Sequence, residues 1–287
     1  MRTRFAPAPT GWLHLGHVLN AEYVWGSGAE VILRIEDHDR ERCRPEYDAG
    51  ILDDLDWLGY RADFPIVRQS DRDDIYRDAV ECLRAHDLVY ACSCTRAGID
   101  RRTPHLAPDA PRAPLAPHAP EAPHAPEAPH AELRYDGFCR DRGLPLTDGV
   151  GWRVRIDPGV ERFVDGIVGP QEQDPSQQCG DVLIRDRLGN WTYQFVASVD
   201  DHRQDVDLVI RGVDLLASTG RQIRIARLLG RAVPAAFRHH PLIMKTADQK
   251  LSKSDGDTGV RDLRARGWTP ADVRRAALGD PFARPRT

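Results

Sequence analysis

Four side chains at opposite ends of this chain have types and spacings that suit chemistry on a phosphate group. His14 and His17 follow Pro-Ala-Pro-Thr-Gly and would share one face at the start of a helix, where free N–H groups and partial positive charge favour phosphate. Lys250 and Lys253 belong to Lys-Leu-Ser-Lys-Ser, followed by Asp-Gly-Asp-Thr-Gly, a pattern typical of a mobile cationic loop. Together they predict a site that stabilises the charge of a triphosphate and its pyrophosphate leaving group.

A group of cysteines predicts a metal site. Cys92 and Cys94 form a Cys-x-Cys pair, and Cys139 ends the sequence Tyr-Asp-Gly-Phe-Cys. Three thiolates with a fourth ligand could bind zinc in a near-tetrahedral arrangement, and histidines between residues 104 and 130 are candidates for that ligand. The alternative is a set of reduced cysteines packed as small apolar side chains.

Alternating strand-like and helical segments are expected to position these groups. In the first ninety residues, strand patterns cover residues 2–6 and 30–35, and helical patterns cover residues 15–25, 45–58 and 71–83. After residue 150, β-type runs cover residues 151–156, 181–185, 191–199 and 207–210, and helical runs cover residues 214–229, 260–266 and 270–278. Strand–helix–strand order at this spacing predicts an α/β fold with a parallel sheet covered by helices.

A proline-rich stretch separates the two halves of the cysteine group. Residues 104–130 contain nine prolines and eight alanines, and from Pro108 to Pro129 every third residue is proline. Polyproline II has three residues per turn, so these prolines would line one edge of an extended rod without a core. We interpret the stretch as a solvent-exposed, low-complexity insertion.

Composition and charge narrow the class of protein. No run approaches the ~20 apolar residues of a membrane helix, and the first residues lack the apolar core of a secretory signal, so a cytoplasmic protein with no membrane contact is expected. The net charge is −4, but residues 211–287 hold 16 Lys and Arg against 7 Asp and Glu. This basic third suits a polyanionic partner such as a nucleic acid, and the alternative is a set of solvated helix faces.

Two motifs resemble, in this order, the HIGH and KMSKS sequences of class I aminoacyl-tRNA synthetases: His-Leu-Gly-His at residues 14–17 and Lys-Leu-Ser-Lys-Ser at residues 250–254. Other segments are similar to the glutamyl/glutaminyl branch of these enzymes: residues 4–17, Leu-Arg-Ile-Glu-Asp at 33–37, Trp-Thr-Tyr at 191–193 and Val-Ile-Arg-Gly at 209–212. The resemblance covers nearly the whole chain except the insertion. It implies a Rossmann-type nucleotide-binding core with a zinc-containing insertion and a short C-terminal helical stub.

The resemblance also implies which residues form the site. The catalytic residues would be His14, His17, Lys250 and Lys253. ATP, with Mg²⁺, would be bound by Thr10, Gly11, His14, Gly16, His17 and Lys253. L-Glutamate would be bound by Arg4, Ala6, Ala8, Glu36, Tyr193 and Arg211. The chemistry agrees, because glutamate offers two carboxylates to arginines and one ammonium to Glu36.

One position departs from the family pattern. Ala8 stands where the family usually has serine, so one hydroxyl contact to the amino acid would be missing. Backbone atoms at Ala6 and Ala8 could still line the pocket. This departure predicts weaker binding of glutamate.

The short glutamyl-queuosine tRNA(Asp) synthetases, a truncated branch of the family, carry a similar Cys-x-Cys…Tyr-x-x-x-Cys zinc site. By this resemblance one structural Zn²⁺ would be bound by Cys92, Cys94, Tyr135 and Cys139. The domains would then be a catalytic core at residues 1–91 and 150–240, a zinc-binding insertion at 92–149, and a KMSKS-like loop with a stem-contact region at 241–287.

Resemblance to this branch implies a two-step activity. Glutamate would be activated with ATP as glutamyl-adenylate and transferred to queuosine in the anticodon stem-loop of tRNA(Asp). Only 33 residues follow Ser254, too few for the large anticodon-binding region of a full glutamyl-tRNA synthetase. A monomer is expected, which would contact the RNA through a basic face made by Arg221, Arg224, Arg227 and Arg231.

Two alternatives remain open at this stage. One is a minimal glutamyl-tRNA synthetase that charges the 3′ end of a tRNA. The other is a non-catalytic relic that binds RNA or an amino acid. ATP–pyrophosphate exchange with glutamate would separate the enzyme from the relic.

Overall fold

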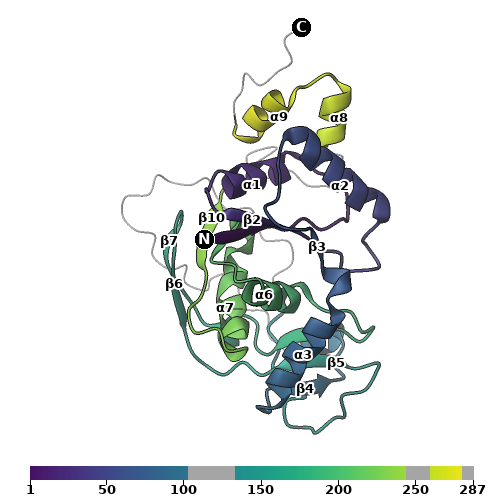
Figure 1. Cartoon of the computed structure of the whole chain (residues 1–287). Coiled ribbons are helices and arrows are strands. Elements are labelled where there is room, and N and C mark those ends of the chain that lie inside the picture. Colours follow the sequence, from purple (N-terminus) through teal and green to yellow (C-terminus); the bar gives the residue numbers. More distant parts are fainter. Residues whose placement is uncertain (103–132, 244–258, 280–287) are drawn as a thin grey trace.

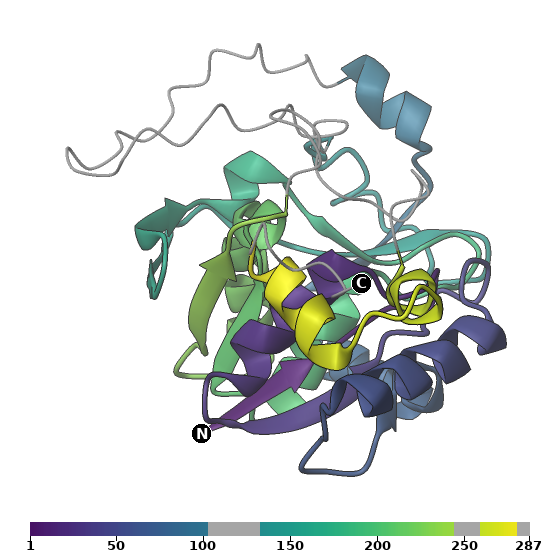
Figure 2. The ribbon, with the colours of Figure 1, turned by 90° about the horizontal axis from the view of Figure 1, so that it is seen from above.

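A computed structural model describes residues 1–102, 133–243 and 259–279 of the chain. The predicted catalytic lysines, Lys250 and Lys253, and the proline-rich insertion at residues 104–130 lie outside the described residues. A seven-stranded sheet runs through the molecule with helices on both sides, and a second sheet has three strands (Figure 1 and Figure 2).

The seven-stranded sheet has the order β3-β2-β1-β9-β10-β6-β7. Its strands are β1 (Arg2–Phe5), β2 (Glu30–Ile35), β3 (Val67–Arg68), β6 (Glu161–Asp165), β7 (Gly169–Gln173), β9 (Leu208–Gly212) and β10 (Ala236–His240). Every neighbouring pair from β3 to β6 is parallel, whereas β6 and β7 form an antiparallel hairpin at the edge. The predicted α/β fold with a parallel sheet is therefore confirmed.

The three-stranded sheet is antiparallel in the order β4-β5-β8, with strands β4 (Val89–Cys92), β5 (Gly151–Val154) and β8 (Val182–Arg185). The helices of the described residues are α1 (Leu15–Trp25), α2 (Pro45–Leu58), α3 (Asp73–Arg84), α4 (Arg96–Arg102), α5 (Pro175–Gln178), α6 (Tyr193–Arg203), α7 (Thr219–Leu228), α8 (Val260–Ala265) and α9 (Pro270–Ala277). Two 3₁₀ turns are η1 (Gln69–Asp71) and η2 (Val213–Ser218). Among these described helices, none has both the length and the apolar character needed to span a bilayer.

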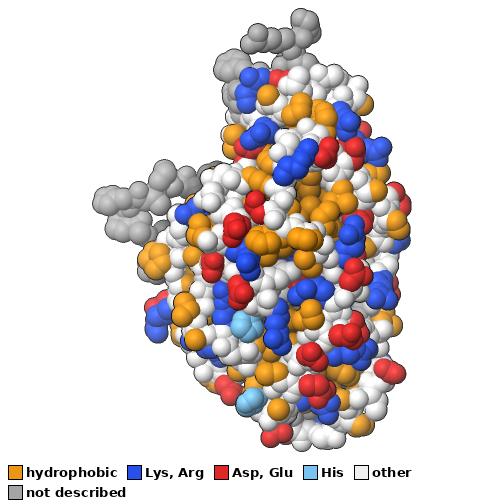
Figure 3. All heavy atoms as spheres, in the orientation of Figure 1, with side chains coloured by type: hydrophobic (Ala, Val, Ile, Leu, Met, Phe, Trp, Pro, Cys, Tyr) orange, Lys and Arg blue, Asp and Glu red, His pale blue; other side chains and the backbone are white. Residues whose placement is uncertain are grey.

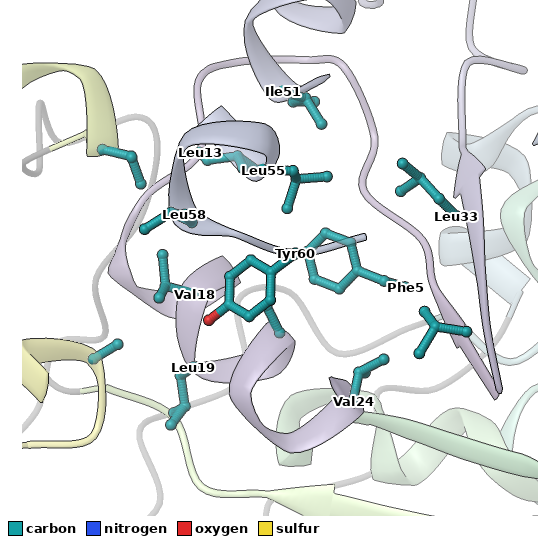
Figure 4. Close-up of a cluster of buried hydrophobic side chains, with 14 of the residues drawn as sticks. Phe5, Leu13, Val18, Leu19, Val24, Leu33, Ile51, Leu55, Leu58 and Tyr60 are labelled. Atoms are coloured by element: carbon teal, nitrogen blue, oxygen red, sulfur yellow. The ribbon is translucent and has the colours of Figure 1, made fainter. Parts of the chain in front are cut away.

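Both faces of the seven-stranded sheet are covered. Successive side chains of a strand point to opposite faces, so a single strand contributes to the packing on both sides. Phe5 and Leu33 belong to the large cluster that α1 and α2 build on one face (Figure 4). Ile32 and Val209 pack on the other face with Ile223 of α7. Burial on both faces explains why β2 reads as a nearly continuous apolar run rather than an alternating one.

The structure corrects two of the predicted elements. Residues 191–199 were expected to be β-type, but α6 begins at Tyr193. Every residue from Phe195 to Asp201 is buried, so this segment lacks the polar face that reveals a helix by its 3.6-residue period. The predicted helical run 214–229 is divided, because η2 ends at Ser218 and α7 follows.

Candidate active site

The carboxyl ends of β1, β2, β9 and β10 and the amino ends of α1 and α6 surround a cavity of about 560 Å³. Open parallel sheets bind ligands at this edge. The cavity is lined by nine of the residues expected from the sequence: Arg4, Ala6, Ala8, His14, Gly16, His17, Glu36, Tyr193 and Arg211. Segments far apart in the chain thus converge on one site.

The remaining predicted residues of this site lie elsewhere. Thr10 and Gly11 are not among the lining residues and belong to the turn between β1 and α1, where the Thr10 N–H donates to the Ala8 carbonyl at 2.8 Å. Lys250 and Lys253 lie outside the described residues. The described residues on either side of them do reach the site: Ile243 lines the cavity, and Gly259 forms a β-bridge with His14.

The two histidines at the start of α1 have defined ring orientations. Nδ1 of His14 accepts a hydrogen bond from the Gly16 N–H at 3.0 Å, and Nδ1 of His17 accepts one from the His14 N–H at 3.1 Å. Both rings therefore carry a proton on Nε2, and each can donate from that atom. A Cβ at Gly16 would lie 2.9 Å from Cε1 of His14, so the absence of a side chain there allows this arrangement.

A buried charge network forms the base of the cavity. Asp201 accepts from Arg34 at 2.8 Å and from Arg4 at 3.2 Å, and these two arginines lower the pKa of Asp201 although burial opposes the shift. Glu36 lies 3.4 Å from Arg34, and burial raises the pKa of Glu36 although Arg34 opposes the shift. Arg34 and Asp200, both fully buried, complete the network. It holds Arg4 and Glu36 in place at the cavity wall.

Arg211 is a buried cation with neutral partners. Its side chain donates to Nε2 of His239 at 3.0 Å, to Oε1 of Gln222 at 2.6 Å and to Oγ1 of Thr219 at 2.9 Å. Among the described residues, no carboxylate lies within ion-pairing distance of its guanidinium, and burial lowers the pKa of Arg211. A buried charge without a counterion is costly, so Arg211 makes this part of the cavity a site for an anion.

The cysteine group forms a compact cluster beside β4. The sulfur atoms of Cys92, Cys94 and Cys139 all lie within 4.8 Å of one another, and the Cys94 and Cys139 sulfurs are 3.6 Å apart. The Tyr135 hydroxyl oxygen lies 3.4 Å from the Cys92 sulfur and 3.9 Å from that of Cys94. In a tetrahedral zinc site, Zn–S bonds of about 2.3 Å separate the sulfurs by about 3.8 Å. The three sulfur atoms and the Tyr135 oxygen thus form a group compact enough for such a site.

The environment of this cluster favours a thiolate at Cys139, whereas burial raises the pKa of the neighbouring Cys94. Burial raises the pKa of Cys139, but hydrogen bonds from the Ser93 backbone, Tyr135 and Cys94 outweigh it and lower the pKa to about 7. Arg102 also donates to the Cys94 sulfur at 3.3 Å. Metals bind the deprotonated thiol, so these contacts suit a metal site.

The predicted basic face of four arginines is wrong. Arg221 is 4% exposed, and Arg231 donates to the backbone carbonyls of Asp201 and Val206. Arg224 and Arg227 both bind Glu161 of β6. Sequence spacing showed that these side chains share a side of the helix but not that other elements cover it. On the face drawn in Figure 3, basic and acidic side chains are interspersed.

Several residues around the cavity were not predicted from the sequence. Asn20, Asp214 and His240 line it, and Arg34 and Asp201 hold its base. Arg34 belongs to the Leu-Arg-Ile-Glu-Asp motif at residues 33–37, and its charge in an apolar strand was the available signal. Asn20 and His240 have no local signal, because only the packing of α1 beside β10 brings Nε2 of His240 to 3.2 Å from Oδ1 of Asn20.

Comparison with known proteins agrees with this geometry. Residues 1–116 and 148–278 match the family described as tRNA synthetases class I (E and Q), catalytic domain. The chain is 38% identical to the glutamyl-Q tRNA(Asp) synthetase of Rhodobacter capsulatus, over 96% of this chain and 99% of that protein. It is 37% identical to glutamate–tRNA ligase 2 of Cereibacter sphaeroides, over 93% of this chain and 58% of that protein.

A solved structure shows the same likeness. The crystal structure of a glutamate tRNA ligase from Elizabethkingia meningosepticum, in complex with its amino acid, superposes with a TM-score of 0.74 at 25% identity. The match covers 96% of this chain and 60% of that chain. The chain therefore spans nearly all of the glutamyl-Q relative and less than two thirds of the two ligases.

Proposed function

Because the chain belongs to the class I tRNA synthetases of the E and Q type, we propose that it activates L-glutamate with ATP and transfers it to queuosine in the anticodon of tRNA(Asp). Membership of this family makes it an ATP-dependent ligase. The observation that supports glutamate as the substrate is Arg211, a buried cation at the cavity that lacks a carboxylate partner among the described residues. The 38% identity to a glutamyl-Q tRNA(Asp) synthetase supports the acceptor.

Glutamate fits the charges of the cavity. Its side-chain carboxylate would bind Arg211 through two parallel hydrogen bonds, and its ammonium would lie beside the carboxylate of Glu36. Arg4 adds a cation near the α-carboxylate, and Asp201 keeps Arg4 in position. Binding fixes the α-carboxylate for reaction, so the chain acts mainly by orienting its substrates.

In the first step an oxygen of the glutamate α-carboxylate attacks the α-phosphorus of ATP, and the bond to the bridging oxygen breaks. Glutamyl-adenylate and pyrophosphate result. The Nε2–H groups of His14 and His17 donate to phosphate oxygens as their charge grows, with Mg²⁺ bound to ATP. We assign Lys250 and Lys253 to the pyrophosphate, since Ile243 and Gly259 on either side of them lie at the cavity.

In the second step a hydroxyl of the queuosine cyclopentenediol attacks the activated carbonyl carbon. An ester forms, AMP leaves with the electrons of the broken bond, and the hydroxyl proton is released. The protein needs no nucleophile of its own in either step.

The cysteine cluster supports a structural zinc site. Zinc would be held by Cys92, Cys94, Tyr135 and Cys139, whose sulfur atoms lie within 4.8 Å of one another and whose phenol oxygen lies 3.4 and 3.9 Å from two of them. The ion would supply cross-linking between β4 and the segment after the insertion. It takes no part in either step.

Transfer of labelled glutamate tests the proposal. The protein is incubated with ATP, Mg²⁺ and tRNA(Asp) that carries queuosine or guanosine at the wobble position, each lacking the 3′-terminal adenosine. Label on the queuosine tRNA alone is the expected result. Failure to label it, with an active exchange of pyrophosphate into ATP, would contradict the assigned acceptor.

A second function is favoured by the 37% identity to a glutamate–tRNA ligase. A chain of this kind would charge the 3′ end of a tRNA. Label that requires the 3′-terminal adenosine and ignores queuosine would establish it instead.

A further inference from the structure

Behind Arg211, away from the cavity, lies a buried carboxylate–imidazole pair that has no place in the two steps above. Asp165 is at the end of β6 and His239 is in β10, and their side chains are fully buried. Oδ2 of Asp165 lies 2.6 Å from Nδ1 of His239, and Nε2 of His239 accepts from Nε of Arg211 at 3.0 Å. Neither residue of the pair lines the cavity.

The hydrogen bonds around Asp165 fix the proton on His239. Oδ1 of Asp165 accepts from the backbone N–H groups of Ile167, Val168 and His239 at 3.0, 2.9 and 3.2 Å. Oδ2 therefore faces Nδ1 of the imidazole. A carboxylate can only accept, so Nδ1 must carry the proton. Nε2 then has a lone pair, which is what the Nε–H of Arg211 requires.

The neutral imidazole leaves the guanidinium free to bind an anion. Burial and the neighbouring Arg211 lower the pKa of His239, although Asp165 opposes the shift. With Nε bound to His239 and one N–H each bound to Gln222 and Thr219, two N–H groups of the guanidinium remain for the Tyr193 hydroxyl, which also interacts with Arg211, and for an anion. These belong to its two terminal nitrogens, the pair that binds a carboxylate side by side.

We propose that Asp165 and His239 are positioning residues, which hold the Arg211 guanidinium in the orientation that receives the side-chain carboxylate of glutamate. The inference rests on the proposed function, and it adds two residues from β6 and β10 to the specificity of that site. They act through hydrogen-bond geometry and never contact the substrate.

Asp165→Asn is the sharpest test, because it preserves shape. Three backbone N–H groups demand an oxygen at Oδ1, so the new amide nitrogen must point at Nδ1 of His239. That donor forces the proton to Nε2, where it opposes the Nε–H of Arg211. In ATP–pyrophosphate exchange we expect the KM for glutamate to rise about 10–100-fold, the KM for ATP to stay within about 2-fold, and Tm to change little.

Two substitutions of His239 form a matched pair. His239→Gln places an acceptor where Nε2 was, whereas His239→Asn reaches only towards Asp165. We expect the glutamine variant to keep a glutamate KM within about 5-fold of the wild type and the asparagine variant to lose about 10–100-fold. In the Asp165→Asn background, His239→Gln should restore glutamate binding. His86→Asn, at an exposed histidine after α3, is the control.

Several outcomes would overturn the inference: an unchanged glutamate KM in Asp165→Asn, an equal rise in the KM of ATP, or equal effects of the two His239 variants. A wild-type protein without glutamate-dependent exchange would instead overturn the proposed function. The ring ¹⁵N shifts of His239 then still decide, because they need no activity. Nδ1–H in the wild type and Nε2–H in Asp165→Asn are expected, and Nε2–H in the wild type would refute the inference.

Discussion

At the scale of single residues, two buried charges stand out because the described part of the chain does not balance them. Arg211 has only neutral hydrogen-bond partners, and neither carboxylate oxygen of Asp54 accepts a hydrogen bond there. Arg4 and Arg34 are instead paired with acidic side chains. An uncompensated buried charge lowers the stability of the fold. Substitution of either residue should therefore have an effect that substitution of a paired residue would not have.

Arg211→Gln should separate glutamate binding from folding. Loss of the guanidinium removes the partner of the substrate's side-chain carboxylate, and breaking a buried ion pair costs about 3–5 kcal/mol. We expect the KM for glutamate in ATP–pyrophosphate exchange to rise at least about 100-fold, with no loss in Tm. Arg203→Gln, at an exposed arginine of α6, should leave both values unchanged. A glutamate KM within threefold of the wild type would refute the role of Arg211.

Asp54→Asn should reveal the cost of a buried carboxylate through its pH dependence. Burial, with Asp53 nearby, raises the pKa of Asp54 to about 6. The native pKa exceeds the unfolded one, so the stability that protonated Asp54 contributes is present below about pH 4 and is lost as the pH rises to about 6. Above that range the asparagine variant should be more stable by about 2 kcal/mol, a Tm about 4–8 °C higher.

Thermal unfolding of both proteins between pH 4 and pH 8 checks this expectation. The difference in Tm should grow through the lower half of that range and then stay constant. Asp56→Asn, at an exposed position of the same helix, should show no such trend. A difference in Tm that does not vary with pH would rule out titration of Asp54 as the cause.

At the scale of elements, the C-terminal helices hold the start of α1. Val273 and Ala277 of α9 pack in one cluster with Val18 and Leu19 of α1, next to the two site histidines (Figure 1). The N–H of Val260, at the start of α8, donates to the carbonyl of Leu13 at 2.8 Å. Short helices depend on such packing and on their caps, so the cap of α9 bears on the site.

Thr269→Ala should loosen α9. Thr269 and Asp272 form a capping box, in which Oγ1 of Thr269 accepts from the Asp272 N–H at 3.2 Å and Oδ2 of Asp272 accepts from the Thr269 N–H at 3.0 Å. Loss of the cap should cost about 1 kcal/mol, a fall in Tm of about 2–4 °C. Hydrogen exchange should accelerate in α9 first. Thr269→Ser keeps the hydroxyl and should behave as the wild type, and equal losses in both variants would contradict the explanation.

At the scale of the whole molecule, order along the chain differs from order in space. Strands β6, β9 and β10 are neighbours in the sheet although their sequences start at residues 161, 208 and 236. Cys92 and Cys139, on either side of the proline-rich insertion, likewise end in one cluster. Contacts between residues far apart in sequence close long loops. A metal ion bound where such segments meet would stabilise the fold by restricting the loop between them.

We therefore predict that the stability of the whole chain depends on bound zinc. The purified protein should contain one zinc ion per molecule, and Cys139→Ser should lose it together with about 5 °C or more in Tm. Elemental analysis and thermal unfolding measure the two effects. Cys82→Ser, at an exposed cysteine outside the cluster, is the control. Protein that is stable and free of zinc after purification without chelators would refute the zinc site.

The sequence by itself determined the local elements and the chemistry of the motifs. Residues 15–25 and 45–58 were predicted as the helices that the structure contains, because apolar periodicity is a local signal. The cysteine spacing and the residues expected to bind glutamate were likewise readable, since they belong to motifs with fixed spacing. Apolar periodicity did not reveal α6, because every residue from Phe195 to Asp201 is buried.

Only the tertiary structure decided which charged side chains lie at the site and which partners they have. Arg211 and Arg221 look alike in sequence, yet one lines the cavity with neutral partners while the other belongs to a helix that packs against β6 and β7. Asp165 and His239 meet 74 positions apart because β6 and β10 are adjacent strands. Partners of a buried charge depend on which strands become neighbours, and strand order is a property of the folded sheet rather than of any local segment.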